Sequence, residues 1–396
     1  MNKNLTTTNQ NSKLALSKAK SLLDITNKLL ANKENRQLLQ SFKFVPFIID
    51  KGHSDRIHSI AISPDGKTIV SGSTDRTIKI WDMQSGECLN TLKGHSHWIT
   101  SIAISPNGKT IVSGSEDKTI KIWDMQSGEC LNTLEGHSRG AISPNGKTIV
   151  SESGDKTIKI WDMQSGECLN TLEGHSDSIF SIAISPNGKT IVSGSYDSTI
   201  KIWDMQSGKC LNTLEGNSDG IESIAISPNG KIIVSGSEDE TIKIWDMQSG
   251  ECLNTLEGHS HSIFSIAISP NGKTIVSGSA DRTLKIWDMQ SGECLNTLKG
   301  YSNRIASIAI SPNGKTIVSG SEDSTIKIWD MQSGECIYTI DNSAMVSIDK
   351  DGYFVGEMEA IKKLTRVSEA PLSQRKLTDE EIKHFRKKGN FLEIGN

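Results

Sequence analysis

The stretch Thr77-Ile-Lys-Ile-Trp-Asp82 decides the fold, because it occurs seven times along the chain with one Ile-to-Leu change in a single copy. Its Trp-Asp pair falls at residues 81–82, 123–124, 161–162, 203–204, 245–246, 287–288 and 329–330, at intervals of 42 residues apart from one of 38. A unit repeated at this period cannot bury its apolar face alone. We therefore expect the units to stack as one array over roughly residues 51–340 of the 396-residue chain.

Each unit has the pattern of four short strands separated by turns. In the first unit we expect strands at residues 58–63, 68–73, 77–82 and 88–92. The stretch Pro64-Asp-Gly-Lys67 has the composition of a turn, because Pro pre-sets φ and Gly accepts a positive φ. Strands rich in Val, Ile and Thr at this spacing predict one antiparallel four-stranded sheet per repeat.

The unit resembles the WD40 repeat. The matching residues are Gly52-His53 at its start, Asp75 in the third loop and Trp81-Asp82 at the end of the third strand. The resemblance covers all seven units and implies an all-β fold, a WD40 β-propeller whose blades surround a central channel. It also implies a hydrogen-bonded tetrad in each blade, in which Ser accepts the indole N–H of Trp and His links Ser to Asp.

The resemblance gives these tetrads a structural role, and their recurrence in every repeat argues against a hydrolase triad. Five repeats carry the full set: His53, Ser71, Asp75 and Trp81; His95, Ser113, Asp117 and Trp123; His137, Ser151, Asp155 and Trp161; His175, Ser193, Asp197 and Trp203; His259, Ser277, Asp281 and Trp287. In units five and seven, Asn217 and Tyr301 replace the His. We expect each of these two blades to lose about 1–2 kcal/mol where a buried partner is left unsatisfied.

Repeat three departs from the pattern in two ways. It is four residues short, because Gly136-His-Ser-Arg-Gly-Ala-Ile-Ser143 replaces the longer segment found at residues 174–185 in the next unit. Its Ser-Glu-Ser153 also replaces the Ser-Gly-Ser of the other units. We expect a local defect at the channel wall and an otherwise intact blade.

Two flanking segments predict a degenerate eighth blade. Residues 345–356 resemble the first two strands of a repeat, and residues 364–368 fall where a third strand would lie. Residues 44–50 precede the first repeat at the place of a fourth strand. We expect residues 343–368 to form an eighth blade whose outer strand comes from residues 44–50, with a seven-bladed ring as the alternative.

The remaining segments lie outside the array. Residues 1–12 are rich in Asn and Thr and are expected to be a disordered tail. Residues 13–41 carry apolar residues at helical spacing, which predicts an amphipathic helical segment that packs on the propeller or mediates oligomerisation or docking of a partner. Residues 369–396 predict a helical tail that begins at the capping box Thr378-Asp-Glu-Glu381. The propeller is expected at residues 42–368, with WD repeats at 52–93, 94–135, 136–173, 174–215, 216–257, 258–299 and 300–341.

Composition restricts the function classes. The net charge is −4, from 43 basic and 47 acidic residues, which argues against a general nucleic-acid or membrane-binding surface. We expect neither a transmembrane helix nor a signal peptide, because the chain has no apolar run of the length that either needs. Seven cysteines, one per repeat, are expected to be free, small, buried residues of a cytoplasmic protein. Their spacing is not that of metal ligands, and we expect no metal and no cofactor.

Differences among the near-identical repeats indicate where function lies. The turns after the first and third strands hardly vary, whereas the loop before the first strand and the turn between the second and third strands vary strongly. These variable segments belong to one face of a propeller, and we expect a partner to bind there. The alternative is relaxed constraint at solvated loop tips. The candidate partner-binding residues are Arg56, Arg76, Trp98, Lys118, Arg139, Tyr196, Glu222, Glu238, Glu240, Arg282, Arg304 and Glu322.

The sequence therefore favours a non-catalytic scaffold that binds a protein or peptide partner. Basic variable residues in units one to three and acidic ones in unit five suit a partner with its own charge pattern. One alternative is an enzyme framed by the propeller, although no carboxylate pair, metal spacing or phosphate loop breaks the repeat. The other is weak nucleic-acid binding through the basic units, which the acidic unit five would oppose.

Overall fold

The computed structural model describes residues 52–340 and four short strands at residues 346–348, 354–356, 367–368 and 373–375. The predicted disordered tail, the predicted helices at residues 13–41 and after residue 378, and the strand at residues 44–50 lie outside the described residues. Within the part of the chain that is described, no helix is long and apolar enough to cross a membrane.

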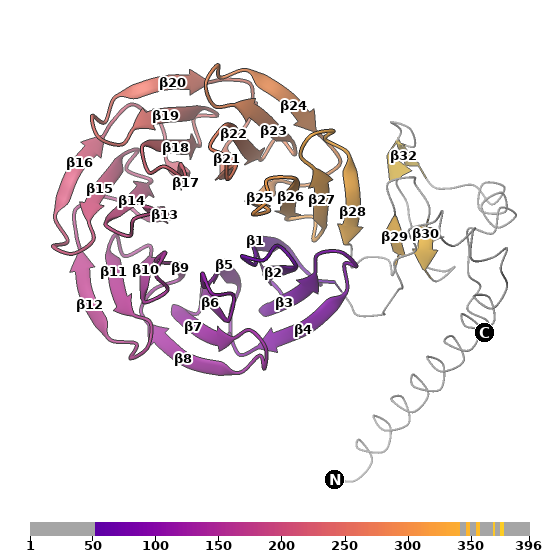
Figure 1. Ribbon diagram of the computed structural model, residues 1–396, viewed down its shortest axis with the longest axis horizontal. Helices are drawn as coiled ribbons and strands as arrows, with labels where there is room; N and C mark the ends of the chain where they lie inside the picture. The colour runs from indigo at the N-terminus through magenta and orange to yellow at the C-terminus, as the bar shows by residue number, and fades with distance from the viewer. Residues whose placement is uncertain (1–51, 341–345, 349–353, 357–366, 369–372, 376–396) are drawn as a thin grey trace, which may run out of the picture. The chain divides into compact units, whose positions relative to one another are not determined.

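Between residues 52 and 340 the chain forms seven four-stranded antiparallel sheets, which are the blades of a ring (Figure 1). In every blade the four strands follow one another in chain order from the central channel to the outer rim. The all-β propeller predicted from the Trp-Asp repeat is therefore confirmed. We number the blades 1 to 7 in chain order.

The first and second strands of each blade lie closest to the channel. The innermost strands are β1 (Ile57–Ile62), β5 (Ile99–Ile104), β9 (Arg139–Ile142), β13 (Ile179–Ile184), β17 (Ile221–Ile226), β21 (Ile263–Ile268) and β25 (Ile305–Ile310). The second strands are β2 (Thr68–Ser73), β6 (Thr110–Ser115), β10 (Thr148–Glu152), β14 (Thr190–Ser195), β18 (Ile232–Ser237), β22 (Thr274–Ser279) and β26 (Thr316–Ser321).

The third and fourth strands complete each blade toward the rim. The third strands end at the Trp-Asp pair and are β3 (Thr77–Asp82), β7 (Thr119–Asp124), β11 (Ile158–Asp162), β15 (Ile200–Asp204), β19 (Ile242–Asp246), β23 (Leu284–Asp288) and β27 (Ile326–Asp330). The outermost strands are β4 (Cys88–Lys93), β8 (Cys130–Glu135), β12 (Cys168–Leu172), β16 (Cys210–Leu214), β20 (Cys252–Leu256), β24 (Cys294–Leu298) and β28 (Cys336–Ile340).

The hydrophobic core lies between the blades, because each sheet buries one face against the next sheet. Between blades 4 and 5, for example, Val192, Ile202 and Leu214 pack against Ile221 and Trp245. The same set of positions recurs at four other interfaces, and at the interface between blades 2 and 3 only the counterpart of Ile221 is missing. The stacking that the repeat period requires is thus supplied by equivalent apolar residues from blade to blade.

The ring closes with seven blades, so the prediction of an eighth blade is wrong. Ile57 of β1 packs in one cluster with Val318 and Ile326 of blade 7. The Ile60 amide donates a hydrogen bond to Ser307 Oγ at 2.9 Å, as the Ile102 amide does to Ser59 Oγ between blades 1 and 2. Blade 7 therefore meets blade 1 through an ordinary interface, which leaves no place for an inserted blade.

The segment expected to form the eighth blade instead makes separate pairs of strands. Strand β29 (Val346–Ile348) pairs with β30 (Phe354–Gly356), where the sequence predicts two adjacent strands. Strand β31 (Val367–Ser368) pairs with β32 (Ser373–Arg375) and not with a strand of that hairpin.

The interface between blades 7 and 1, which we call the seam, contains a side chain that the other interfaces lack. At the other six interfaces an Asn of the outermost strand lies against the Gly of the next blade's third turn, as Asn90 does against Gly128. At the seam Tyr338 takes this position beside Gly86, and its hydroxyl donates to the Ser85 carbonyl at 2.8 Å. A tyrosine specific to the last repeat thus strengthens the contact that closes the ring.

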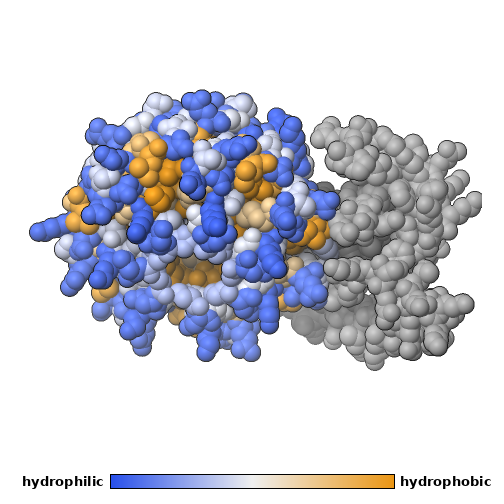
Figure 2. Space-filling model, turned by 45° about the horizontal axis from the view of Figure 1, so that its top comes forward, coloured by the Kyte–Doolittle hydropathy of each residue, from blue (hydrophilic) through white to orange (hydrophobic). Residues whose placement is uncertain are grey.

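The expectation of buried cysteines is wrong for most of the ring. Cys130, Cys168, Cys210, Cys252 and Cys294 are exposed free thiols, and only Cys88, beside Tyr338, is buried. The cysteine begins the outermost strand, whose outer side has no neighbouring blade. The next residue of that strand, a leucine such as Leu211, is also exposed, and apolar patches are visible among the hydrophilic side chains in Figure 2.

The structure places the tetrad residues in hydrogen-bonding contact in blades 1, 2, 4 and 6. There the His nitrogens lie 2.7–2.9 Å from Asp Oδ2 and 2.6–2.8 Å from Ser Oγ, and the indole N–H of Trp donates to the same Oγ at 2.8 Å. Burial lowers the pKa of His53, His95 and His175, although the Asp partner opposes the shift. These three histidines are therefore neutral near pH 7.

The other three blades vary this arrangement. In blade 3 the ring of His137 is turned, so that Nδ1 contacts Ser151 at 2.9 Å and Nε2 lies 3.4 Å from Asp155. In blade 5 the buried Nδ2 of Asn217 has no hydrogen-bond partner. In blade 7 the hydroxyl of Tyr301 contacts Ser319 Oγ, the acceptor that His contacts elsewhere. Blade 5 therefore has the unsatisfied group expected from the sequence, whereas blade 7 replaces the lost contact.

Candidate functional site: the mouth of the central channel

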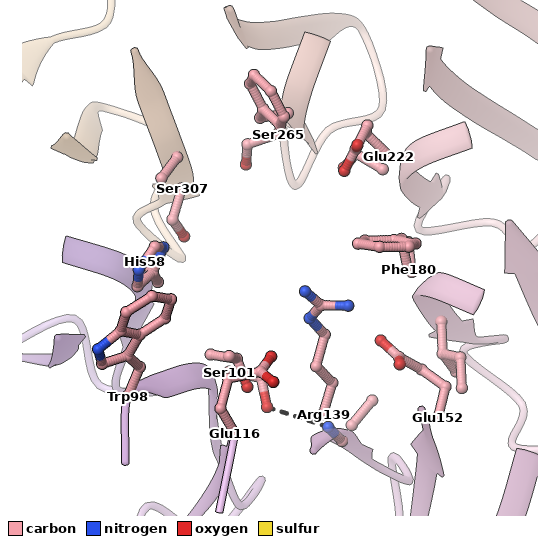
Figure 3. Close-up of a pocket in the computed structure, with 18 of the residues that line it drawn as sticks. His58, Trp98, Ser101, Glu116, Arg139, Glu152, Phe180, Glu222, Ser265 and Ser307 are labelled. Carbon is pink, nitrogen blue, oxygen red and sulfur yellow. Dashed lines mark hydrogen bonds between the residues drawn. The ribbon is translucent and has the colours of Figure 1, made fainter. Parts of the chain in front are cut away.

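A cavity of about 450 Å³ lies in the central channel, and all seven blades contribute to its wall (Figure 3). The variable segments meet on this face, because the Thr74 amide of the second turn donates to the Arg56 carbonyl of the loop before β1 at 2.9 Å. The two invariant turns are joined in the same way, from the Met83 amide to the Lys67 carbonyl at 2.7 Å. The cavity thus opens among the segments in which the repeats differ.

In six of the seven blades a β-bulge in the innermost strand turns one variable residue toward the channel. The register of β1 with β2 shifts between Ile57 and Ser59, and five other blades have the same irregularity. Bulges commonly re-aim a side chain beside a binding site. The residues at the six bulges are His58, Thr100, Phe180, Glu222, Phe264 and Ala306, and all six line the cavity.

Blade 3 has no bulge, because its four missing residues are those of the loop and the bulge. Strand β9 starts at Arg139, which pairs across the sheet with Glu152. In the other blades the residues at these two positions are Ser and Gly, as in the pair Ser59 and Gly72. The defect expected at the channel wall is therefore a pair of charged residues that lines the cavity.

Aromatic and cationic side chains alternate around part of the wall. The guanidinium of Arg139 lies 4.5 Å from the ring centre of Phe180, and that of Arg304 lies 4.4 Å from the ring centre of Phe264. Tyr196 packs on Phe180 with ring centres 4.2 Å apart. These cation–π contacts hold both arginines against the wall of the cavity.

Blades 4 and 5 form an acidic wall. The Tyr196 hydroxyl lies 2.9 Å from Glu222 Oε1 and 3.1 Å from Glu238 Oε1, so the two carboxylates compete for its single proton. Burial, and then repulsion from Glu238, raises the pKa of Glu222 against the effect of the Tyr196 bond. Burial and the two carboxylates also raise the pKa of Tyr196, which remains a hydrogen-bond donor.

Blades 7 and 1 form a basic wall that is already partly neutralised. Arg304 lies 2.6 Å from the buried Glu322, and Arg56 lies 3.6 Å from the same carboxylate. Burial lowers the pKa of His58, and Arg304, Arg139 and Arg56 lower it further against the opposing effect of Glu322. His58 is therefore neutral at pH 7, and its ring stacks 6.3 Å from that of Trp98.

Glu152 is the most unusual residue of the site. It is only 2% exposed, and its Oε2 atom has no hydrogen-bond partner. Burial raises the pKa of Glu152 to about 7, with Arg139 opposing the shift. A buried carboxylate that retains an unsatisfied oxygen is costly.

The predicted partner-binding residues divide into three groups. Trp98, Arg139, Tyr196, Glu222, Glu238 and Arg304 line the cavity. Arg56 and Glu322 contact each other beside it. Arg76, Lys118, Glu240 and Arg282 lie at the tips of the second turns and do not line it.

Sequence reasoning missed His58, Glu116, Glu152, Phe180 and Phe264 as site residues. All but Glu152 stand at positions that vary among the repeats, so the signal was present in the sequence. The departure of Glu152 from Ser-Gly-Ser is also visible there, but its place beside the channel depends on the register of the shortened strand. Among the described residues, no group of three His, Cys, Asp or Glu side chains is arranged to hold a metal ion.

Comparison with known protein families matches seven segments of the chain to WD40, described as WD domain, G-beta repeat. The matched residues are 44–82, 86–124, 128–162, 166–204, 208–246, 250–288 and 292–330. The chain belongs to the WD40 repeat family. The seven matched segments of this WD40 protein each end at the Trp-Asp pair that closes the third strand of a blade.

Two similar curated proteins each match a short part of this WD40 protein. A ribosome biogenesis protein BOP1 homolog of Drosophila grimshawi is 42% identical over 55 residues, which are 14% of this chain and 7% of that protein. The homolog of Drosophila ananassae is 40% identical over 55 residues, with the same coverage. The chain therefore matches about 7% of the length of these relatives.

Proposed function

We propose that this WD40 protein is a non-catalytic scaffold that binds a protein or peptide partner on its variable face. The observation that carries the proposal is that one variable residue from each of six blades, the residue at the bulge, lines the same cavity. Constraint on the frame alone would leave the six bulges alike, yet they hold a histidine, a threonine, two phenylalanines, a glutamate and an alanine. Trp98 and Tyr196 add partly exposed aromatic residues of the kinds enriched in binding hot spots.

Backbone strain supports the same face. In every blade the last residue of the second turn has a φ of 63° to 70° without being glycine. A side chain in this left-handed region costs about 1–2 kcal/mol. All seven blades retain a side chain there, and four residue types occupy the position, as in Arg76, Ser198 and Glu240. Retained strain of this kind is typical of functional surfaces.

The alternatives have less support. Four glutamates line the cavity against two arginines, so nucleic-acid phosphates would be repelled there. The similarity to ribosome biogenesis proteins spans 55 residues, little more than one repeat, and supports the class of scaffold without naming a pathway. The five exposed thiols favour a reducing location, and we place the function in the cytoplasm.

Selection from a random-peptide phage library on the immobilised protein tests this proposal. The selected peptides are then measured by fluorescence anisotropy against a variant in which Trp98, Tyr196, Glu238 and Arg304 are all alanine. A matched control carries alanine at Lys67, Gln84, Lys109 and Gln126, which are exposed on the invariant face. We expect the first variant to lose at least about 90% of the affinity and the control to keep it. The reverse pattern would move the binding surface to the other face.

A further inference from the structure

The two departures of blade 3 coincide at one point of the channel wall. Glu152 stands where every other blade has glycine, and at those glycines an added Cβ would lie 2.1–2.7 Å from an atom of the following blade. Glycine is therefore needed for close packing at the other six interfaces. In blade 3 this position holds a long carboxylate side chain that lines the cavity, and its cross-strand neighbour is Arg139.

Arg139 does not satisfy the carboxylate. Its guanidinium stacks on Phe180, and in the described part of the chain no ion pair joins it to Glu152. Figure 3 shows the two side chains extending from neighbouring strands toward the same open space. The Oε2 atom of Glu152 thus remains a buried acceptor next to a cavity that has room for a donor.

The charges around this acceptor select the kind of donor. Glu116, Asp155 and Glu222 surround Glu152 and raise its pKa, and Arg139 is the cation that opposes them. Across the cavity Arg304 is paired with Glu322. A neutral donor would satisfy the oxygen but leave the carboxylates uncompensated, whereas a cationic donor satisfies the oxygen and compensates the charge.

We propose that Glu152 binds the ammonium or guanidinium group of a lysine or arginine side chain that a peptide partner inserts into the mouth of the channel. The inference rests on the proposed function, because it takes the ligand of the variable face to be a peptide. The exposed parts of Trp98 and Tyr196 flank the entrance and cover the peptide backbone on either side of the inserted residue. Because the pKa of Glu152 is raised to about 7, part of the protein carries a protonated Glu152 at pH 7. Binding of a cationic side chain displaces this proton.

Peptide arrays with matched sets of 12-residue peptides test the assignment. Within a set the flanking residues are the same, and the central residue is lysine, its neutral analogue norleucine, arginine, or its neutral analogue citrulline. We expect the full-length protein to prefer lysine over norleucine, and arginine over citrulline, by at least about tenfold. In a separate experiment, butylamine and butylguanidine are added at up to about 10 mM. This experiment tests whether the ligand is a free cation and not a peptide side chain.

Two variants and one control connect the preference to the residue. Glu152→Gln keeps the shape of the side chain and removes its charge, and Glu152→Gly restores the residue of the other blades. Both should reduce the preference to about onefold. Glu167→Gln removes an exposed glutamate from a turn of the same blade on the invariant face and should leave the preference unchanged.

Each outcome decides a separate point. Equal binding of charged and neutral peptides overturns the role of Glu152 and leaves the proposed function standing, whereas binding of no peptide overturns both. A preference that survives Glu152→Gln and Glu152→Gly also overturns the assignment. If the free amines bind as tightly as the lysine and arginine peptides, the acceptor is assigned correctly and the peptide source is wrong.

Discussion

Blade 5 contains a defect that one substitution should repair. Asn217 is buried and its Nδ2 atom has no partner, whereas the Trp245 indole still donates to Ser235 Oγ at 2.9 Å. Asp239 accepts the Ser218 amide at 3.0 Å, so the carboxylate is already at the tetrad position. The Asn217→His substitution would place one ring nitrogen on Ser235 and the other on Asp239, as in blades 1, 2, 4 and 6.

The magnitude follows from the groups involved. The substitution removes a buried unsatisfied donor, which costs about 1–3 kcal/mol, and adds two hydrogen bonds of about 0.5–1.5 kcal/mol each. Desolvation of the imidazole opposes part of this gain. We expect the free energy of unfolding to rise by about 2 kcal/mol.

The assay is urea unfolding monitored by tryptophan fluorescence at pH 8. The gain should shrink at pH 5.5, because burial lowers the pKa of the equivalent histidines below the unfolded value near 6.5. The unfolded state then binds protons that the folded state excludes, so the stabilisation is complete above about pH 6.5 and declines as the solution is acidified.

Matched variants make the result interpretable. His175→Asn introduces the blade 5 defect into blade 4 and should cost about 2 kcal/mol. Tyr301→His should gain much less than Asn217→His, because Tyr301 already contacts Ser319. Unchanged unfolding midpoints for both Asn217→His and His175→Asn would refute the idea that the tetrad contributes to stability.

Three further substitutions test the packing and the site, each by urea unfolding. Gly194→Ala puts a Cβ 2.4 Å from Ile221 Cγ2 and should lower the free energy of unfolding by about 1–3 kcal/mol. Gly154→Ala is the control and should change the free energy of unfolding little, because its Cβ meets nothing closer than 3.7 Å. Equal effects of the two substitutions would contradict the role of close packing. Tyr338→Asn removes the hydrogen bond to Ser85 and should lower the free energy of unfolding by about 1–3 kcal/mol. The control is Ile337→Leu, which restores the residue of the other repeats next to Tyr338 and should have no effect. The stability of Glu152→Gln should match that of the parent at pH 5 and exceed it at pH 8. The folded carboxyl faces Arg139, Glu116, Asp155 and Glu222, and its pKa is raised from 4.5 to about 7. The protonated carboxyl therefore contributes to the stability of the parent at low pH, and this contribution is lost as the pH rises through about 7. A stability difference that is the same at both pH values would argue against this burial.

The fold could be predicted from sequence because its information is local and repeated. Each unit shows its own strands, turns and Trp-Asp ending, and seven copies leave little ambiguity about the architecture. The number of blades could not be read in the same way. It depends on whether the face of blade 7 fits that of blade 1 directly, and residues 345–356 have the pattern of strands whether or not they enter the ring.

The site could be predicted only in part. Variation among the repeats pointed to the face that holds Trp98, Tyr196 and Glu238, since loops tolerate change where strands do not. Which side chains enter the channel is decided by the bulges, and a bulge is a property of strand register that one repeat does not reveal. The sequence therefore does not single out Phe180, whose ring lies under Arg139, among the variable positions. The burial of Cys210 was misjudged because the outermost strand has no neighbour on its far side.

In the described ring every blade consists of four consecutive strands, including blades 1 and 7 on either side of the seam. The usual 42-residue period of the sequence therefore corresponds to one whole sheet of the ring. Unequal crossing-over between near-identical copies would remove or insert one whole sheet and leave every strand with its partners. Circular permutation at any linker between blades would likewise preserve all strand pairs, and Tyr338 would mark where the original ends had met.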